Sequence, residues 1–254
     1  MVNSITIKGL SKNFGNQQIL DGIDISILQG QCCLLVGKNG SGKTTLLRCI
    51  FDLFKPDRGE VVINGMSYSS TPIEIKKIIG IVSEDNPLIP EFTAFQHLEF
   101  VGLLHKIPSN ELKIRIESVF EYFFENKSDL NKKIANFSTG MKKKLSLCAA
   151  ILHKPQVLIL DEPFSGLDIY SLNMFTIFLK SYLSENRTIL FTSHSFEHLN
   201  DIVTHIAILD DKKIIFHDSI GVFTDSGKKQ IDKSLLEILQ DKSIQNTKEL
   251  EWLN

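Results

Sequence analysis

The spacing of hydrophobic residues predicts a mixed α/β protein. Residues 5–10 and 19–28 alternate apolar with polar side chains, as half-buried antiparallel strands do. Residues 32–36 and 157–160 are unbroken apolar runs, which predict buried strands, the second of them in the centre of the sheet. Residues 93–127 follow a helical period and are rich in Phe and Leu. We therefore expect a mostly parallel, doubly wound core sheet with antiparallel N-terminal strands and an inserted all-helical subdomain.

Breakers and turn signals place the remaining elements. The helix that follows the strand at 32–36 is expected to end near Phe54, before Lys55-Pro56, and Asn64-Gly65 predicts a hairpin turn. Further elements are expected at 59–64 (strand), 78–82 (strand), 142–153 (helix), 171–184 (helix) and 188–192 (strand), followed by one more helix and strand. This organisation indicates one domain over residues 1–220, with a helical subdomain at about 85–155, and a C-terminal tail over 221–254. The tail is polar with one amphipathic piece near 234–240, a regulatory contact or a solvated helix.

Composition and charge exclude several classes of protein. The formal net charge of −2 offers no basic field, so no nucleic-acid partner is expected. The longest apolar runs are about five to seven residues, against the roughly 20 that a membrane-spanning helix needs. The N-terminus does not resemble a secretory signal, and the four cysteines lack CxxC spacing, so buried reduced thiols are expected rather than a metal site or disulfides. These features predict a cytoplasmic protein.

The segment from Gly37 to Thr45, GKNGSGKTT, fits the template GxxxxGK[ST] and lies between a predicted strand and a predicted helix. Glycines allow consecutive backbone N–H groups to form a concave nest for phosphate, and the helix N-terminus adds partial positive charge. Lys43 is expected to reach the outer phosphates and the Thr44 hydroxyl to ligate Mg²⁺. The alternative is a glycine turn before a helix, with a lysine on the surface. We expect binding of a nucleoside triphosphate through Gly37, Lys38, Asn39, Gly40, Ser41, Gly42, Lys43, Thr44 and Thr45.

The sequence VLILDEP supplies the second part of the predicted chemistry. It delivers Asp161 and Glu162 to the carboxyl end of a buried strand, where open α/β sheets bind ligands. Asp161 suits a ligand of Mg²⁺, and Glu162 suits a base that polarises water against the terminal phosphate. His194 follows the strand at 188–192 and is expected to hold the phosphate and the water in line. The alternatives are a solvated acidic strand cap and a surface or packing histidine.

Several phenylalanines have no obvious reason to lie where they do. Phe14 adjoins Gly15 in a polar, turn-like segment at 11–17, and it is a candidate for stacking on adenine or for anchoring the loop in the core. Six more lie in the predicted helical subdomain: Phe92, Phe95, Phe100, Phe120, Phe123 and Phe124. We expect most of them to form the core of a helix bundle and a few to line a groove for another protein.

Taken together, residues 1–220 resemble the nucleotide-binding domain of ABC transporters, a P-loop NTPase fold. Gly37–Thr45 resembles the Walker A loop, Asp161-Glu162 the Walker B motif with the catalytic glutamate, and His194 the switch histidine. Phe14 stands at the place of the adenine-stacking aromatic, and Asp168 belongs to a segment that resembles the D-loop. Residues 137–141, FSTGM, resemble the signature LSGGQ, which implies that Ser138 and Gly140 bind the ATP held by a second subunit.

Three residues depart from the family pattern. Thr139 and Met141 replace Gly and Gln of the signature, and Glu84 stands at the Q-loop glutamine, where a carboxylate can still ligate Mg²⁺. The altered signature and the glutamate at the Q-loop position both resemble ATPases of two-component export systems. The resemblance implies that residues 84–105 contact the coupling helix of a permease, with phenylalanines as anchors.

The resemblance implies an ATPase that binds ATP and Mg²⁺ and closes as a dimer to drive a separate transmembrane permease subunit. We expect an exporter, with an importer's ATPase or a soluble ABC-type ATPase not coupled to transport as alternatives, and a nucleotide-sensing module with little turnover as a third. A homodimer and a heterodimer fit equally. The protein is then peripheral on the inner face of the cell membrane, held there by the permease.

Overall fold

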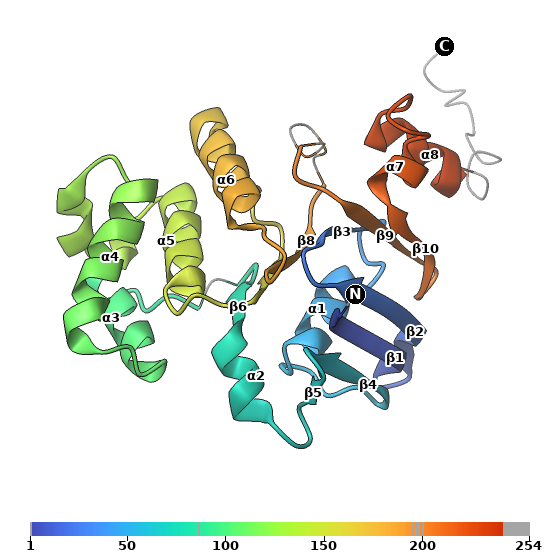
Figure 1. Cartoon of the computed structure of the whole chain (residues 1–254), viewed down its shortest axis with the longest axis horizontal. Helices are drawn as coiled ribbons and strands as arrows, with labels where there is room; N and C mark the ends of the chain where they lie inside the picture. Colours follow the sequence, from blue (N-terminus) through green and yellow to red (C-terminus); the bar gives the residue numbers. More distant parts are fainter. Residues whose placement is uncertain (1, 86, 195, 197–198, 200, 241–254) are drawn as a thin grey trace, which may run out of the picture.

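The computed structural model describes residues 2–85, 87–194, 196, 199 and 201–240, arranged as two sheets with a cluster of helices at one end (Figure 1). The first sheet has the order β2-β1-β4-β5 and is antiparallel. Its strands span Asn3–Phe14 (β1), Gln17–Leu28 (β2), Arg58–Ile63 (β4) and Met66–Ser67 (β5). The alternating pattern at 5–10 and 19–28 therefore predicted strands and their antiparallel pairing correctly.

The second sheet is the core sheet, with the order β10-β9-β3-β8-β7-β6. Five of its strands pair in parallel, and β10 is antiparallel to β9 at one edge. The predicted parallel sheet is confirmed. The strand predicted at the centre, β7, is fully buried but lies next to the edge strand β6. The strands span Cys32–Val36 (β3), Ile79–Val82 (β6), Val157–Leu160 (β7), Thr188–Thr192 (β8), His205–Asp210 (β9) and Lys213–Ser219 (β10).

The helical subdomain contains α3 (Ala94–Leu104), α4 (Ser109–Phe123) and α5 (Thr139–Ile151), with short 3₁₀ turns at Lys127–Asn131 and Ile134–Asn136. Thr93 and Gln96 form a capping box at the start of α3, which satisfies backbone N–H groups at that end. Phe120, Phe123 and Phe124 are buried, whereas the side chain of Phe100 is 43% exposed. Phe92 and Phe95 are partly buried and pack against the same core, so the prediction that most of these phenylalanines form core is confirmed.

Some predicted boundaries were wrong because tertiary contacts overrode local signals. Helix α1 spans Lys43–Ile50 and ends before Phe54, since the chain folds back and the N–H groups of Leu53 and Phe54 both donate to the Arg48 carbonyl. Strand β1 continues to Phe14, through a segment predicted as a turn, because residues 12–14 pair with β2. Helix α5 begins at Thr139 rather than Lys142, because Ser138 caps it.

The remaining helices are α2 (Pro72–Ile78), α6 (Ile169–Tyr182), α7 (Ile220–Phe223) and α8 (Ile231–Gln240). The predicted amphipathic piece at 234–240 lies in α8, and residues 241–254 of the tail lie outside the described residues. The helix predicted between β8 and β9 falls partly on residues that are not described. All four cysteines are buried and free, as predicted. No helix within the described residues is long and apolar enough to cross a membrane.

Candidate functional site: a phosphate-binding loop with an acidic strand end

The glycine loop connects β3 to α1 and depends on glycine at three positions. A Cβ on Gly37 would lie 2.3 Å from the Leu209 carbonyl oxygen on β9, so only glycine fits against that strand. Gly40 and Gly42 have φ angles of 78° and 104°, which other residues rarely adopt. The loop geometry therefore requires the residue type that the motif contains.

The N-terminus of α1 faces the inside of this loop. The first turn of α1 contains no acidic residue, so its partial positive charge is left for an external anion. The ammonium group of Lys43 donates to the carbonyl oxygens of Gly37 at 2.9 Å and Lys38 at 3.2 Å. Burial lowers the pKa of Lys43, an effect opposed by the charges of Glu162 and Asp161. The loop thus carries a cation placed to bind phosphate.

A cavity of about 420 Å³ opens beside this loop and brings together residues from four predicted motifs. Ten of the predicted site residues line it: Asn39, Gly40, Gly42, Lys43, Thr44, Thr45, Glu84, Asp161, Glu162 and His194. Ile19, Lys143 and Ser165 also line it. Gly37, Lys38 and Ser41 belong to the loop but are not part of the cavity wall, and Gly37 instead packs against β9.

Asp161 follows β7 and is fixed by a hydrogen bond from the neighbouring strand. The Thr192 hydroxyl at the end of β8 donates to its Oδ1 at 2.7 Å, and both residues are buried. Mg²⁺ prefers oxygen ligands, and the cavity offers them on Thr44, Glu84 and Asp161. In the described part of the chain, no group of three or more His, Cys, Asp or Glu side chains could hold a metal ion without further ligands. This donor set fits a Mg²⁺ held jointly by one or two protein groups and by phosphates.

Glu162 has an unusual backbone conformation and a partly buried carboxyl group. Its φ angle is 48°, in the left-handed region, and its N–H donates to the Thr192 hydroxyl at 2.9 Å. His194 Nε2 lies 3.2 Å from Glu162 Oε1. Burial raises the pKa of Glu162, and the nearby His194 lowers it in part. A carboxyl group with a raised pKa beside a phosphate-binding loop is suited to act as a base.

Phe14 is not part of the cavity wall. It lies at the end of β1 with 44% of its surface exposed, and it packs edge-on against Phe54 at a ring distance of 5.2 Å. Lys12 lies over the ring at 5.4 Å. The phenylalanine is therefore not buried in the core, and one part of its surface is accessible for stacking.

Besides Phe14, Gly37, Lys38 and Ser41, three more predicted ligand residues lie outside this cavity. Ser138 is exposed and caps α5, where its Oγ accepts from the Met141 N–H at 3.2 Å. Gly140 lies in the first turn of α5, against the segment that contains Gly166. Asp168 caps α6 by accepting from the Ser171 N–H at 2.7 Å, and this bond lowers its pKa. Ser138, Gly140 and Asp168 are thus absent from the wall of their own chain's cavity.

Sequence reasoning missed Lys143 and Thr192. Lys143 belongs to a run of three lysines on α5, a pattern typical of a solvated face, yet its side chain is buried and lines the cavity. Thr192 is the last residue of an apolar strand, and its position next to Asp161 follows from the pairing of β7 with β8. A polar residue that ends a buried strand was the one available signal.

The site combines a glycine loop between a buried strand and a helix with an aspartate and a glutamate at the end of a nearby parallel strand. This combination is typical of a P-loop nucleotide-hydrolysing site. A sequence model described as ABC transporter matches residues 20–165, more than half of the 254 residues. The chain belongs to this family. It is an ATP-binding subunit of the ABC transporter type and an ATPase.

Several named relatives are similar to this chain over most of its length. The chain is 29% identical over 231 residues to the ABC transporter ATP-binding protein NatA of Bacillus subtilis, covering 89% of this chain and 94% of the relative. It is 34% identical to the linearmycin resistance ATP-binding protein LnrL of the same organism, covering 86% and 69%. It is 30% identical to the Nod factor export ATP-binding protein I of Ralstonia nicotianae, covering 83% and 65%. The chain thus spans nearly all of NatA and about two thirds of the other two.

Solved structures confirm the fold. The structure of an ATP-binding subunit of an ABC transporter superposes with a TM-score of 0.85 at 24% identity, covering 94% of this chain and 100% of the other. A dimeric, post-hydrolysis structure of an ATP-binding cassette with ADP and Pi superposes with a TM-score of 0.77 at 24% identity, covering 85% and 98%. Subunits of this family work with transmembrane partners and form dimers.

Proposed function

We propose that this ATPase powers an exporter, and that ATP closes a dimer in which each chain completes the nucleotide site of the other. The observation that carries the proposal is the division of the predicted ATP ligands between two surfaces. The phosphate loop, Asp161 and Glu162 line one cavity, whereas Ser138 is exposed at the N-terminus of α5 and is absent from that cavity. A helix N-terminus with an exposed serine suits a phosphate presented by a second chain.

Within the site, Glu162 is the proposed base. Its carboxylate accepts the proton of the attacking water, and His194, 3.2 Å away, orients the carboxylate and the terminal phosphate. Lys43 and the backbone N–H groups at the start of α1 stabilise negative charge on the phosphates. Thr44 and Asp161, with Glu84 nearby, would hold Mg²⁺, which would neutralise further charge on the phosphates.

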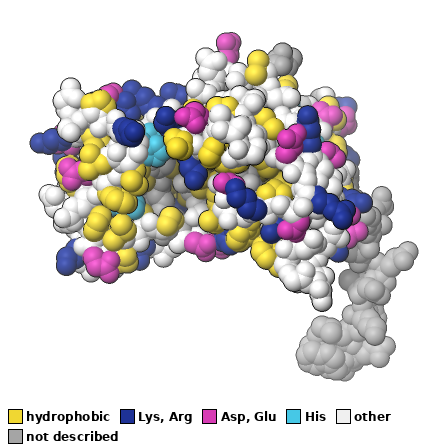
Figure 2. Space-filling model, turned by 90° about the horizontal axis from the view of Figure 1, so that it is seen from below, with side chains coloured by type: hydrophobic (Ala, Val, Ile, Leu, Met, Phe, Trp, Pro, Cys, Tyr) yellow, Lys and Arg dark blue, Asp and Glu magenta, His cyan; other side chains and the backbone are white. Residues whose placement is uncertain are grey.

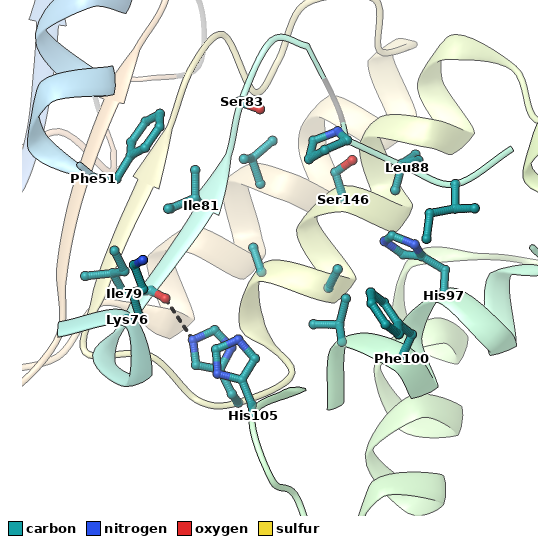
Figure 3. Close-up of a pocket in the computed structure, with 17 residues that line it drawn as sticks. Phe51, Lys76, Ile79, Ile81, Ser83, Leu88, His97, Phe100, His105 and Ser146 are labelled. Carbon is teal, nitrogen blue, oxygen red and sulfur yellow. Dashed lines mark hydrogen bonds between the residues drawn. The ribbon is translucent and has the colours of Figure 1, made fainter. Parts of the chain in front are cut away.

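The permease is proposed to dock in a groove of about 400 Å³ between α3, α5 and β6, here termed the α3 groove (Figure 3). His97 and Phe100 of α3 point into it, opposite Ile79 and Ile81 of β6. In the space-filling view of this side of the molecule, histidine lies among hydrophobic side chains (Figure 2). An apolar groove of this size suits a short helix with one or two anchoring side chains.

The histidines of the α3 groove indicate that its partner is uncharged at the contact. Burial lowers the pKa of His97, and it lowers the pKa of His153 to about 4 with help from His105. The rings of His105 and His153 stack at 3.7 Å, and His153 Nε2 lies 2.8 Å from the Ile79 carbonyl oxygen. His97 is buried, and its Nδ1 has no hydrogen-bond partner among the described residues. A partner with uncharged, largely apolar side chains at the contact would complement the groove.

Export is the direction that the relatives support best. LnrL and the Nod factor proteins are named for resistance and export, and the Thr139, Met141 and Glu84 departures resemble ATPases of such two-component systems. An importer's ATPase is the alternative within the class. To distinguish an exporter from an importer, the chain is purified with its permease and both are reconstituted in vesicles. The measurement is which compounds stimulate ATP hydrolysis when they are added on the side of the membrane that carries this chain.

The Glu162→Gln variant tests the catalytic proposal. Loss of the base is expected to reduce turnover roughly 100- to 10,000-fold while leaving ATP binding intact, so the variant accumulates as an ATP-loaded dimer. Gel filtration with light scattering in ATP and Mg²⁺ measures the dimer, and Glu60→Gln, an exposed residue of β4, is the matched control. Normal hydrolysis by Glu162→Gln contradicts the assignment of the base.

The docking proposal has its own test. Phe100→Arg places a charge in the α3 groove, and it is expected to release the chain from membranes while the purified protein binds ATP normally. Ile114→Arg is the control, because Ile114 is 67% exposed on α4 and does not line this groove. Membrane fractionation measures the effect. Equal membrane retention of both variants contradicts docking at this groove.

A further inference from the structure

The backbone at Glu162 is held in a conformation that needs support. A glutamate with a φ angle of 48° is in the left-handed region, which costs free energy for any residue with a Cβ and persists only where neighbouring groups hold it. Its N–H donates to the Thr192 hydroxyl at 2.9 Å. Its carbonyl oxygen accepts a hydrogen bond from the ammonium group of Lys143. Both peptide groups that flank the Glu162 Cα are therefore fixed by side chains from other elements.

Lys143 makes a second contact in the same segment. Its ammonium group also donates to the Ser165 carbonyl oxygen at 3.1 Å, so one cation joins two carbonyls of the turn that follows β7. The side chain is buried and lines the nucleotide cavity. Burial lowers the pKa of Lys143, while the charges of Glu162, Glu84 and Asp161 oppose this shift. A buried ammonium group is costly unless it is hydrogen-bonded, and here it is held by backbone acceptors rather than by a direct ion pair.

The lysine is also well placed relative to the signature segment. It lies on α5, little more than one turn after Ser138. In the first turn of α5, Gly140 lies against Gly166, which belongs to the segment that follows β7 and Glu162. The buried side chain of Lys143 therefore links the N-terminal part of α5 directly to the turn that contains Glu162. The side chain does not need to touch the nucleotide to make this link.

We infer that Lys143 is a positioning residue for ATP hydrolysis: by binding the carbonyl oxygens of Glu162 and Ser165, it holds the Glu162 backbone so that the carboxylate faces the terminal phosphate. This inference rests on the proposed role of Glu162 as the base. It assigns Lys143 no bond to nucleotide and no proton transfer. Lys143 also lines the same cavity as Glu84, the carboxylate that this chain carries at the Q-loop position.

The test compares Lys143→Met with Lys143→Gln in the full chain. Methionine keeps the unbranched apolar stem and removes all three N–H donors, whereas glutamine keeps two neutral N–H donors in a similar volume. Steady-state hydrolysis gives kcat and KM for ATP, and equilibrium binding in Mg²⁺ gives Kd. We expect kcat to fall at least about 10-fold in the methionine variant and less in the glutamine variant, with KM and Kd within about twofold of wild type. Lys144→Met is the matched control on the same helix and keeps normal turnover.

The outcomes separate this inference from the proposed base. If Glu162→Gln abolishes turnover and Lys143→Met leaves kcat normal, the base stands and the positioning role is overturned. If both Lys143 variants raise KM and lower kcat together, the lysine acts in nucleotide binding or stability and the inference is also overturned. In the Glu162→Gln background, Lys143→Met is expected to lower the residual rate no further, because the group that it positions is gone. If Glu162→Gln hydrolyses ATP normally, the proposed role of Glu162 as the base is contradicted, and the inference about Lys143 is overturned with it.

Discussion

The Thr192→Val substitution tests the hydrogen bonds that Thr192 makes to the two adjacent acidic residues, Asp161 and Glu162. Thr192 is fully buried at the end of β8, and its hydroxyl serves two partners at once. It donates to Asp161 Oδ1 at 2.7 Å and accepts from the Glu162 N–H at 2.9 Å. Valine has nearly the same shape, so the substitution removes both hydrogen bonds without opening a cavity.

The expected magnitude follows from the two groups left without a partner. An unsatisfied buried polar group costs about 1–3 kcal/mol, and hydrogen bonds to charged groups lie toward the upper end of that range. We expect the free energy of unfolding to fall by roughly 2–4 kcal/mol, since Asp161 can recover part of the loss from its second oxygen. For a domain of this size, 1 kcal/mol lowers Tm by about 2–4 °C, which predicts a decrease of roughly 5–15 °C.

Thermal and urea unfolding of the nucleotide-free protein measure the change, and ATP hydrolysis is measured in parallel. Thr176→Val on α6 is the control, because among the described residues the Thr176 hydroxyl bonds within its own helix alone, to the Leu172 carbonyl oxygen at 3.0 Å. That variant is expected to stay within about 0.5 kcal/mol of wild type. Equal stability and equal turnover of the two variants would refute the view that Thr192 holds the acidic pair.

Three further predictions concern pH and packing. His194 lowers the pKa of Glu162, so His194→Ala is expected to move the acid limb of the kcat–pH profile of the residual activity to higher pH; an unmoved limb contradicts this coupling. Burial lowers the pKa of His153 to about 4 in the folded protein, against 6.5 when unfolded, so its contribution to the free energy of unfolding is present above pH 6.5 and is lost as the pH falls toward 4. Urea unfolding of His153→Gln at several pH values should therefore show a smaller loss of stability over this range, by on the order of 2 kcal/mol. Phe123 is buried among aromatic rings, so Phe123→Ala should lower the free energy of unfolding by about 3–5 kcal/mol in urea, whereas a loss below about 1 kcal/mol contradicts the packing.

Local patterns predicted the elements well where one physical signal dominated. Alternation gave β1 and β2, unbroken apolar runs gave β3 and β7, and turn residues gave the hairpin at Asn64-Gly65. Boundaries failed where a contact distant in sequence decided them, as at the end of α1. Which phenylalanines are core also required the structure, because the faces of α3 and α4 are defined only by what packs on them.

The glycine loop could be predicted from nine consecutive residues, because the groups proposed to bind phosphate are backbone N–H groups, the N-terminus of the next helix and one lysine, all of which are local in the chain. The hydrogen bonds that hold the Glu162 backbone could not be predicted in this way. They come from Thr192 and Lys143, which lie 30 and 19 residues away and meet Glu162 only when β8 pairs with β7 and α5 packs against the turn beyond it. Sequence alone thus determined which chemistry the chain carries, and the tertiary structure decided how its acidic pair is held, because buried hydrogen bonds form only between groups that packing brings together.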